Sequence, residues 1–193
     1  MALEWHDNAR DAIRDLKRAC RVWRGFTLHH TATRQNGKYQ AGAIERWHRF
    51  TRGWLAGMGY HFLIEENGMI VVGDRWREQL NGAHEKGFNH THIGISLVGW
   101  FDKGKDIPTL AQVRSLVFLV RGLATQLAWP QNLMPMASGG AIVRYHCDSA
   151  PKTCPGELWH SHRLDLIASV ISPNPLESAE KLHTILTEEA KKL

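Results

Sequence analysis

A long amphipathic segment between two short apolar ones constrains the fold most. Residues 109–127 carry apolar side chains every three or four positions, the spacing that gathers them on one side of a helix. Thr109 and Gln112 have the spacing of a capping box, and Pro130 ends the pattern. The runs before and after it, 93–98 and 141–145, are short and apolar enough to be strands. A long helix between strands predicts one α/β domain with a central mixed β-sheet flanked by helices.

Residues 26–33 predict a further strand. Alternation places His29 and His30 on opposite faces, so at most one of these adjacent histidines faces a site beside the sheet.

A β-hairpin is predicted over residues 60–72. Glu65-Glu-Asn-Gly68 separates two apolar runs, and Asn-Gly in that position is a strong turn signal. Strict alternation would put Tyr60 on the same face as Phe62 and Ile64.

Composition limits the classes of function. The 193 residues are enough for one domain with a full core, and the net charge of +5 favours anionic partners. No nucleic-acid recognition motif accompanies this charge, so we expect no nucleic-acid partner. Three cysteines are too few for a disulfide framework, which leaves a thiolate free for a metal.

The two ends of the chain are predicted to be helical. Residues 3–23 have apolar positions at helical spacing, namely Ala9, Ala12, Ile13, Leu16, Cys20 and Trp23. This segment is either a helix packed on the domain or a basic helix that touches membrane or envelope. Residues 176–193 predict a last amphipathic helix. The beginning of the chain has no apolar run typical of a signal sequence, so we expect synthesis in the cytosol and export by another route.

Residues 144–155 carry the strongest chemical signal. His146 and Cys154 are preferred zinc donors, and two of them on one short loop form half of a tetrahedral site. Structural zinc sites usually contain Cys-x-x-Cys pairs, which this loop lacks. A pair completed by a third donor from elsewhere resembles a catalytic site with one position left for water. The alternative is a structural loop with a small buried thiol.

A series of short motifs resembles the type 2 N-acetylmuramoyl-L-alanine amidases, in particular the zinc amidases that serve bacteriophages as endolysins and that are related to the peptidoglycan recognition proteins. The resemblance covers about residues 25–160. Its motifs, in chain order, are Leu28-His-His-Thr-Ala-Thr33, Trp47-His48, Gly53-Trp54, Gly59-Tyr-His-Phe62, His84-Glu-Lys-Gly-Phe-Asn89, Ile93-Gly-Ile95, Leu97-Val-Gly99 and His146 with Ala150-Pro-Lys-Thr-Cys-Pro155.

The resemblance implies a role for each matching residue. His29, His146 and Cys154 match the three zinc ligands. Tyr60 and Lys152 match catalytic residues. Residues lining the substrate groove are matched by His84 and Asn89. We divide the chain into a helical extension (1–24), a zinc amidase domain (25–171) and a C-terminal helix (172–193), and the resemblance says nothing about the two ends. His92 departs from the pattern, because relatives usually have serine there.

The expected reaction is zinc-dependent hydrolysis of the amide bond between N-acetylmuramic acid and L-alanine in peptidoglycan. A phage or prophage endolysin of this kind acts on the cell wall after release by a membrane-permeabilising partner, and we expect a monomer. Two alternatives stay open. One is a non-catalytic peptidoglycan-binding module, although such relatives typically lose a ligand that this chain retains. The other is a cytosolic muropeptide-recycling amidase, although those relatives carry aspartate where this chain has Cys154.

Overall fold

The computed structural model describes residues 3–13, 21–130, 133 and 142–193. Its described strands form one mixed sheet in the spatial order β1-β4-β3-β5-β2-β6. The strands β3, β5, β2 and β6 run parallel to one another, whereas β4 is antiparallel to both β1 and β3. Their bounds are β1 Glu4–His6, β2 Gly25–His30, β3 Phe62–Ile64, β4 Ile70–Val72, β5 His92–Leu97 and β6 Val143–Tyr145.

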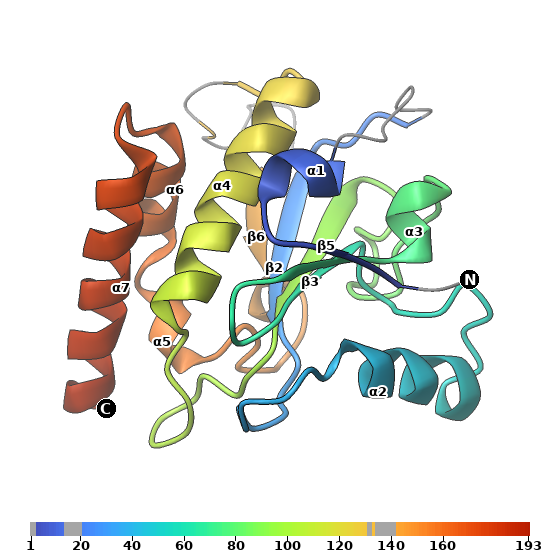
Figure 1. Ribbon diagram of the computed structural model, residues 1–193, viewed down its shortest axis with the longest axis horizontal. Helices are drawn as coiled ribbons and strands as arrows, with labels where there is room; N and C mark the ends of the chain where they lie inside the picture. The colour runs from blue at the N-terminus through green and yellow to red at the C-terminus, as the bar shows by residue number, and fades with distance from the viewer. Residues whose placement is uncertain (1–2, 14–20, 131–132, 134–141) are drawn as a thin grey trace.

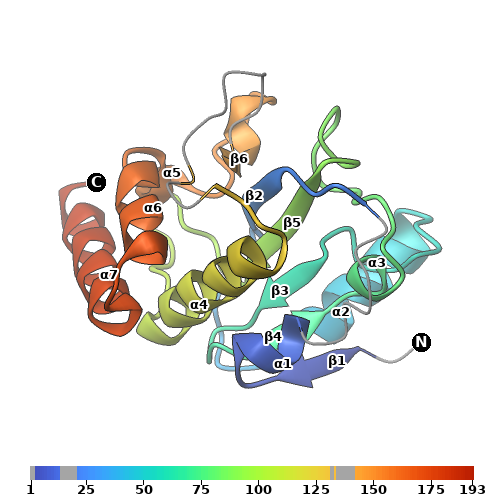
Figure 2. The same ribbon diagram turned by 90° about the horizontal axis from the view of Figure 1, so that it is seen from above.

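Helices cover both faces of this sheet (Figures 1 and 2). Four of them, α1, α4, α6 and α7, lie on one face, and α2 lies on the other. The predicted fold class is therefore confirmed. The helical bounds are α1 Ala9–Ile13, α2 Ala41–Arg46, the π-helix η1 Trp47–Thr51, α3 Asp74–Arg77, α4 Leu110–Gln126, the 3₁₀-helix η2 His146–Asp148, α5 Glu157–His160, α6 Arg163–Ile171 and α7 Pro175–Lys192.

Helix α4 begins at the predicted capping box. The backbone N–H of Gln112 donates to Thr109 Oγ1 at 3.1 Å, and the backbone N–H of Thr109 donates to Gln112 Oε1 at 3.1 Å. These two bonds satisfy N–H groups that a helix end otherwise leaves unpaired. The apolar side of α4 then packs on the sheet and against α1, α6 and α7.

The alternation predicted for β2 is confirmed. Phe26 and Leu28 are fully buried in the main core with the apolar side of α4. Thr27 and His29 point to the opposite face, where they bond to side chains of the segment that precedes β5.

The N-terminal segment differs from its prediction as one helix. Residues Glu4–His6 form β1, which pairs with Val72–Ile70 at the edge of the sheet, and only Ala9–Ile13 are helical before the described part of the segment stops. Edge pairing with β4 is a tertiary contact that helical spacing cannot reveal. Ala9, Ala12 and Ile13 are buried in the main core, as a helix packed on the domain requires. The predicted positions Leu16 and Cys20 lie outside the described residues.

The hairpin is confirmed, but the predicted face of Tyr60 is wrong. Strand β3 begins only at Phe62, so the strict alternation does not extend back to Tyr60. Phe62 and Ile64 enter the main core, whereas Tyr60 packs beside Leu63 and Val71 on the other side of the sheet. This difference places Tyr60 on the same side as His29.

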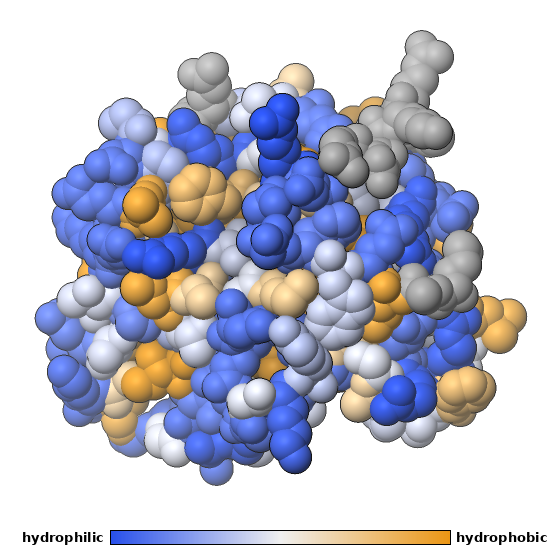
Figure 3. Space-filling model, in the orientation of Figure 1, coloured by the Kyte–Doolittle hydropathy of each residue, from blue (hydrophilic) through white to orange (hydrophobic). Residues whose placement is uncertain are grey.

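The face of the molecule drawn in Figure 3 is mixed in character. Hydrophobic residues occur there in small groups separated by hydrophilic ones. Among the helices that the structure describes, none combines the length and the apolar character that crossing a bilayer requires.

Candidate metal centre

Parallel pairing of β2 with β6 brings two histidines together. Leu28 is the register partner of Tyr145, so the next residues along the two strands, His29 and His146, emerge side by side. Their ring centroids are 4.7 Å apart. The carboxyl ends of neighbouring parallel strands are a common place for a functional site in an open α/β sheet.

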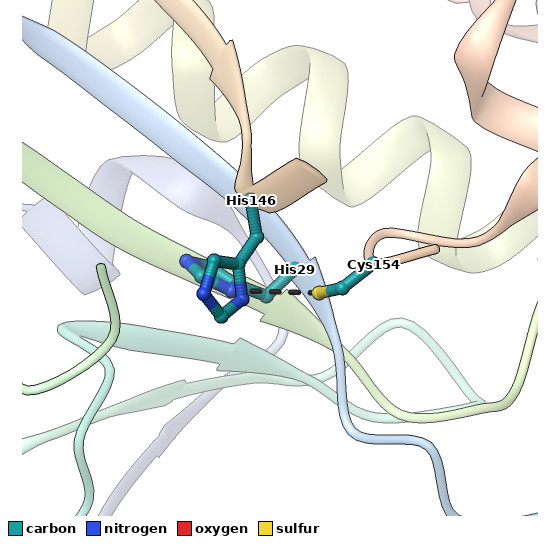
Figure 4. Close-up of side chains that lie close together, drawn as sticks. All are labelled: His29, His146 and Cys154. Carbon is teal, nitrogen blue, oxygen red and sulfur yellow. Dashed lines mark hydrogen bonds between the residues drawn. The ribbon is translucent and has the colours of Figure 1, made fainter. Parts of the chain in front are cut away.

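Cys154 completes a group of three donors (Figure 4). Its Sγ lies 3.5 Å from His29 Nδ1, and one ligand atom from each of the three residues lies within 4.8 Å of the others. Two backbone bonds hold the cysteine in place: His30 N–H donates to Cys154 Sγ at 3.4 Å, and Cys147 N–H donates to the Cys154 carbonyl at 2.9 Å. The three residues predicted as ligands are therefore positioned to bind one metal ion.

The adjacent His30 faces away from this group. Its Nδ1 accepts a hydrogen bond from the backbone N–H of Phe101, and its ring lies beside the ring of Phe101. Of the two neighbouring histidines, only His29 therefore contributes to the centre, as alternation predicts.

The protonation of the three donors suits a metal. Burial lowers the pKa of His29 well below its usual value, and burial together with the nearby Lys152 ammonium lowers that of His146. Both imidazoles are therefore neutral at pH 7 and have a lone pair to donate. Burial raises the pKa of Cys154 to about 12. A cation must therefore displace the thiol proton to obtain the thiolate ligand. Two neutral imidazoles and one thiolate are a donor set that fits Zn²⁺.

A pocket of about 650 Å³ adjoins the three donors. His29 and His146 reach its wall, and it also contains the predicted catalytic residues Tyr60 and Lys152. The ring centroid of Tyr60 is 5.2 Å from that of His29, whereas Lys152 is exposed on the loop that leads to Cys154. The other lining residues are Trp47, His48, Arg52, Trp54, Ala83, His84, Glu85, Lys86, Gly87, Asn89, Ser149 and Ala150.

The two residues predicted to contact substrate also line this pocket, but they have partners within the protein. His84 is buried, and its Nδ1 lies 3.1 Å from His29 Nε2. The side-chain oxygen of Asn89 accepts from the backbone N–H groups of His84 and Glu85, at 2.8 and 2.9 Å. Asn89 thus closes the turn that presents His84. The roles predicted for these two residues, like those of Tyr60 and Lys152, stay predictions.

Comparison with known proteins adds independent information. A family model described as N-acetylmuramoyl-L-alanine amidase matches residues 19–157. The chain is 39% identical over 132 residues to the endolysin of Enterobacteria phage T3, covering 66% of this chain and 77% of the endolysin. It is 29% identical over 142 residues to peptidoglycan-recognition protein SC2 of Drosophila melanogaster, covering 70% of each. Among solved structures, the N-acetylmuramoyl-L-alanine amidase LysC from Clostridium intestinale URNW superimposes with a TM-score of 0.57 and 28% identity, covering 72% of this chain and 80% of LysC.

The chain belongs to the N-acetylmuramoyl-L-alanine amidase family. The predicted family and the prediction of an amide-hydrolysing enzyme are thereby confirmed. In this amidase the matched region contains the three metal-binding candidates, whereas α6 and α7 follow it in the sequence.

Glu85 is a structural residue of the amidase site that sequence reasoning missed. Its carboxylate is fully buried and accepts from Thr27 Oγ1 at 2.5 Å, from Arg144 Nη2 at 2.7 Å and from Ser149 Oγ at 2.6 Å. Burial by itself would raise the pKa of Glu85, but these bonds outweigh it and lower the pKa overall. Thr27 lies two residues before one candidate ligand, and Arg144 two residues before another. Glu85 therefore ties together the two strands that carry the histidines.

The rim of the amidase pocket is aromatic and cationic. The guanidinium of Arg52 lies 5.6 Å from the ring centroid of Trp47 and 5.3 Å from that of Trp54. Trp54 in turn stacks on His48, with 4.7 Å between centroids. Sequence motifs marked Trp47-His48 and Gly53-Trp54 as family features, but only the fold shows that the π-helix η1 and the following loop bring them to one wall.

Proposed function

We propose that this amidase is a zinc-dependent hydrolase that cleaves the amide bond between the lactyl group of N-acetylmuramic acid and L-alanine in peptidoglycan. The observation that carries the proposal is the meeting of His29, His146 and Cys154 in one group, with the two histidines at the wall of a pocket that also contains a tyrosine and a lysine. Zinc held by two neutral imidazoles and a thiolate would have a net charge near +1 and would lower the pKa of a bound water from about 15.7 toward about 7.

The proposed role of Lys152 follows from its charge and position. Hydrolysis adds water to the carbonyl carbon and places negative charge on the carbonyl oxygen before the C–N bond breaks. The Lys152 ammonium, two residues from Cys154 and on the pocket wall, can stabilise that charge. The amine of L-alanine then leaves and takes up a proton.

Tyr60 is proposed to orient the attacking water. Burial raises the pKa of Tyr60 above its usual value, so its hydroxyl stays protonated at pH 7. A protonated phenol can donate one hydrogen bond and accept another, but it is a poor general base. The expected role of Tyr60 is therefore to orient the water relative to the substrate by hydrogen bonding.

Product analysis on purified sacculi tests the reaction. The protein should release L-alanine amino termini without new reducing sugar ends, whereas reducing ends in their place would identify a glycosidase and refute the proposal. Metal analysis should find one zinc per chain. Cys154→Ser should lose both zinc and hydrolysis, whereas the control Cys147→Ser should retain both. A Cys154→Ser variant that kept full activity would also contradict the proposal.

Two other functions make different predictions in the same assays. A non-catalytic peptidoglycan-binding module would bind sacculi without releasing amino termini. A cytosolic recycling amidase would prefer soluble anhydromuropeptides to intact sacculi. Retention of all three candidate ligands, with cysteine rather than aspartate at position 154, favours the lytic enzyme over both.

The biological setting is also proposed. We infer a phage or prophage endolysin, with its reaction carried by the domain at residues 25–171, that reaches the wall after a membrane-permeabilising partner releases it and works as a monomer. Envelope contact would involve the basic N-terminal segment through its charges, because the apolar side chains of α1 are in the core. Reversing the charges of Arg14, Lys17 and Arg18 should then weaken binding to anionic vesicles. Undiminished binding would exclude this contact, and sedimentation analysis would test the monomer.

A further inference from the structure

A chain of hydrogen bonds behind the candidate ligand His29 ends at a backbone carbonyl. His84 Nε2 lies 3.2 Å from the carbonyl oxygen of His92, and His84 Nδ1 lies 3.1 Å from His29 Nε2. The far nitrogen of His29, Nδ1, is the atom 3.5 Å from Cys154 Sγ. The His92 carbonyl, the His84 ring and the His29 ring are thus joined by successive hydrogen bonds that lead to the metal-binding group.

The position of each proton along this line follows from elementary chemistry. A carbonyl oxygen can only accept, so the proton of the neutral His84 ring must be on Nε2. His84 Nδ1 is then an acceptor, and its contact with His29 requires a proton on His29 Nε2. The lone pair of His29 is thereby left on Nδ1, facing Cys154 and His146.

The His84 ring is also held in place by its surroundings. It occupies a slot between Gly82 and Gly94, and a Cβ added at either glycine would overlap it. His61 packs edge-on against it, with 5.7 Å between centroids, and is itself fixed by Gly94 N–H on Nδ1 and by the Leu80 carbonyl at Nε2. The ring therefore has little freedom to turn and exchange its donor for its acceptor.

We propose that His84 is a positioning residue that fixes His29 in the tautomer able to bind a metal through Nδ1. This role differs from the substrate contact that the family resemblance implies, and it rests on the proposed zinc site. Hydrogen bonds of this kind to a ligating histidine set its tautomer and orientation, and their loss commonly weakens metal affinity about 10- to 100-fold.

Two substitutions test the two ring nitrogens of His84 separately. His84→Asn retains an acceptor close to the position of Nδ1, whereas His84→Gln retains a donor close to Nε2 but loses that acceptor. We expect the zinc Kd, measured by competition with a chromophoric chelator, to rise about 10- to 100-fold in His84→Gln and less in His84→Asn. The control His90→Ala, which removes an exposed imidazole from the same segment, should leave the zinc Kd unchanged.

The tautomer can be observed without any metal. In metal-free protein with ¹⁵N-labelled histidine, NMR should show His29 and His84 both protonated at Nε2, and His29 should become a mixture of tautomers in His84→Gln. Protonation of His29 at Nδ1 in the wild type would overturn the proposal.

The outcomes distinguish this inference from the proposed function. If the wild type binds zinc and both variants bind it equally well, while KM rises, His84 is a substrate contact and its proposed positioning role is refuted. If the wild type binds no zinc, the proposed function fails, whereas the NMR measurement still tests whether His84 sets the tautomer of His29. Thermal unfolding of each variant shows whether the fold is retained, and the wild-type tautomer measurement stands even if a variant does not fold.

Discussion

Two parts of the amidase pocket differ in how their polar groups are held: a buried floor, which contains His84 and Glu85, and a more exposed rim, which contains Trp47, Arg52, Trp54 and Lys152. At the floor, His84 and Glu85 are buried, and the Glu85 carboxylate is bonded to Thr27, Arg144 and Ser149. At the rim, Arg52 and Lys152 are exposed, and Arg52 is held by stacking on aromatic rings. Removing the partner of a buried polar group lowers the free energy of unfolding strongly, whereas removing the partner of an exposed group lowers it little. Changes at the floor should therefore act on stability and metal geometry, whereas changes at the rim should act on catalysis and substrate affinity with little loss of stability.

The largest effect on folding is expected at the floor. Glu85→Ala leaves the Arg144 guanidinium, which is 11% exposed, without its carboxylate partner. Breaking a buried pair in this way typically lowers the free energy of unfolding by about 3–5 kcal/mol. The matched control is Glu180→Ala, which breaks the exposed pair with Arg114 and should lower it by at most about 1 kcal/mol. Urea unfolding measures the free energy of unfolding of both variants. Equal small losses in Glu85→Ala and Glu180→Ala would show that the buried floor is not more important for stability than an exposed ion pair.

Among the rim residues, Lys152 is expected to have the largest effect on catalysis. Lys152→Ala removes the proposed oxyanion partner and should lower kcat about 100- to 1,000-fold, the usual result of deleting one such donor. Because Lys152 is exposed, the free energy of unfolding should change by less than about 0.5 kcal/mol. Lys86→Ala removes another cation that lines the same pocket, and it tests whether any positive charge there supports kcat or only that of Lys152. A similar fall in kcat for both lysines would argue against a specific role for Lys152.

Local patterns were enough to predict much of the fold. The capping box of α4, the alternation of β2 and the turn after β3 are encoded within a few residues, and each lies where expected. Strand β1 was missed because it is defined by pairing with β4, which is distant in sequence. Tyr60 was assigned to the wrong face because β3 begins two residues after it, a boundary set by packing rather than by alternation.

The site could be predicted only in part for the same reason. Spacing identified His146 and Cys154, and the family resemblance supplied His29. The contact between His29 and His84 joins residues 55 positions apart, and no spacing rule reveals it. Likewise, Glu85 stood in a recognised motif without a role, because its partners come from β2, β6 and the loop after η2. Residues that act through other residues become visible only in the folded chain.

His48 links the rim to the fold and should make stability depend on pH. Burial, with the nearby Arg75 and Arg52, lowers the pKa of His48 to about 4, and its Nδ1 accepts from the Gly59 N–H. Well above pH 6.5 neither the folded nor the unfolded state is protonated there, so the contribution to stability is complete. Between pH 6.5 and 4 only the unfolded state takes up the proton, and stability falls by at most about 3 kcal/mol.

Comparison with His48→Asn isolates this contribution, because the asparagine side-chain oxygen lies close to the position of Nδ1 and can still accept from the Gly59 N–H, but does not titrate. Other buried histidines, such as His30, titrate over a similar range, so the variant should show a shallower slope rather than none. Chemical denaturation between pH 7 and pH 4 measures it. Parallel stability curves for the two proteins would show that His48 does not contribute.

The smallest effect is expected at the outermost part of the rim. Trp47 is 50% exposed and lines the pocket, so Trp47→Ala should remove a surface on which substrate and Arg52 can stack. A loss of about 1 kcal/mol corresponds to a rise in KM of about fivefold, with kcat unchanged if the contact is equally strong in the ground and transition states. Phe50→Ala is the matched control, since Phe50 is an exposed aromatic residue of the same π-helix that does not line the pocket. A fall in kcat, or an equal rise in KM for Phe50→Ala, would show that the rim acts on more than substrate affinity.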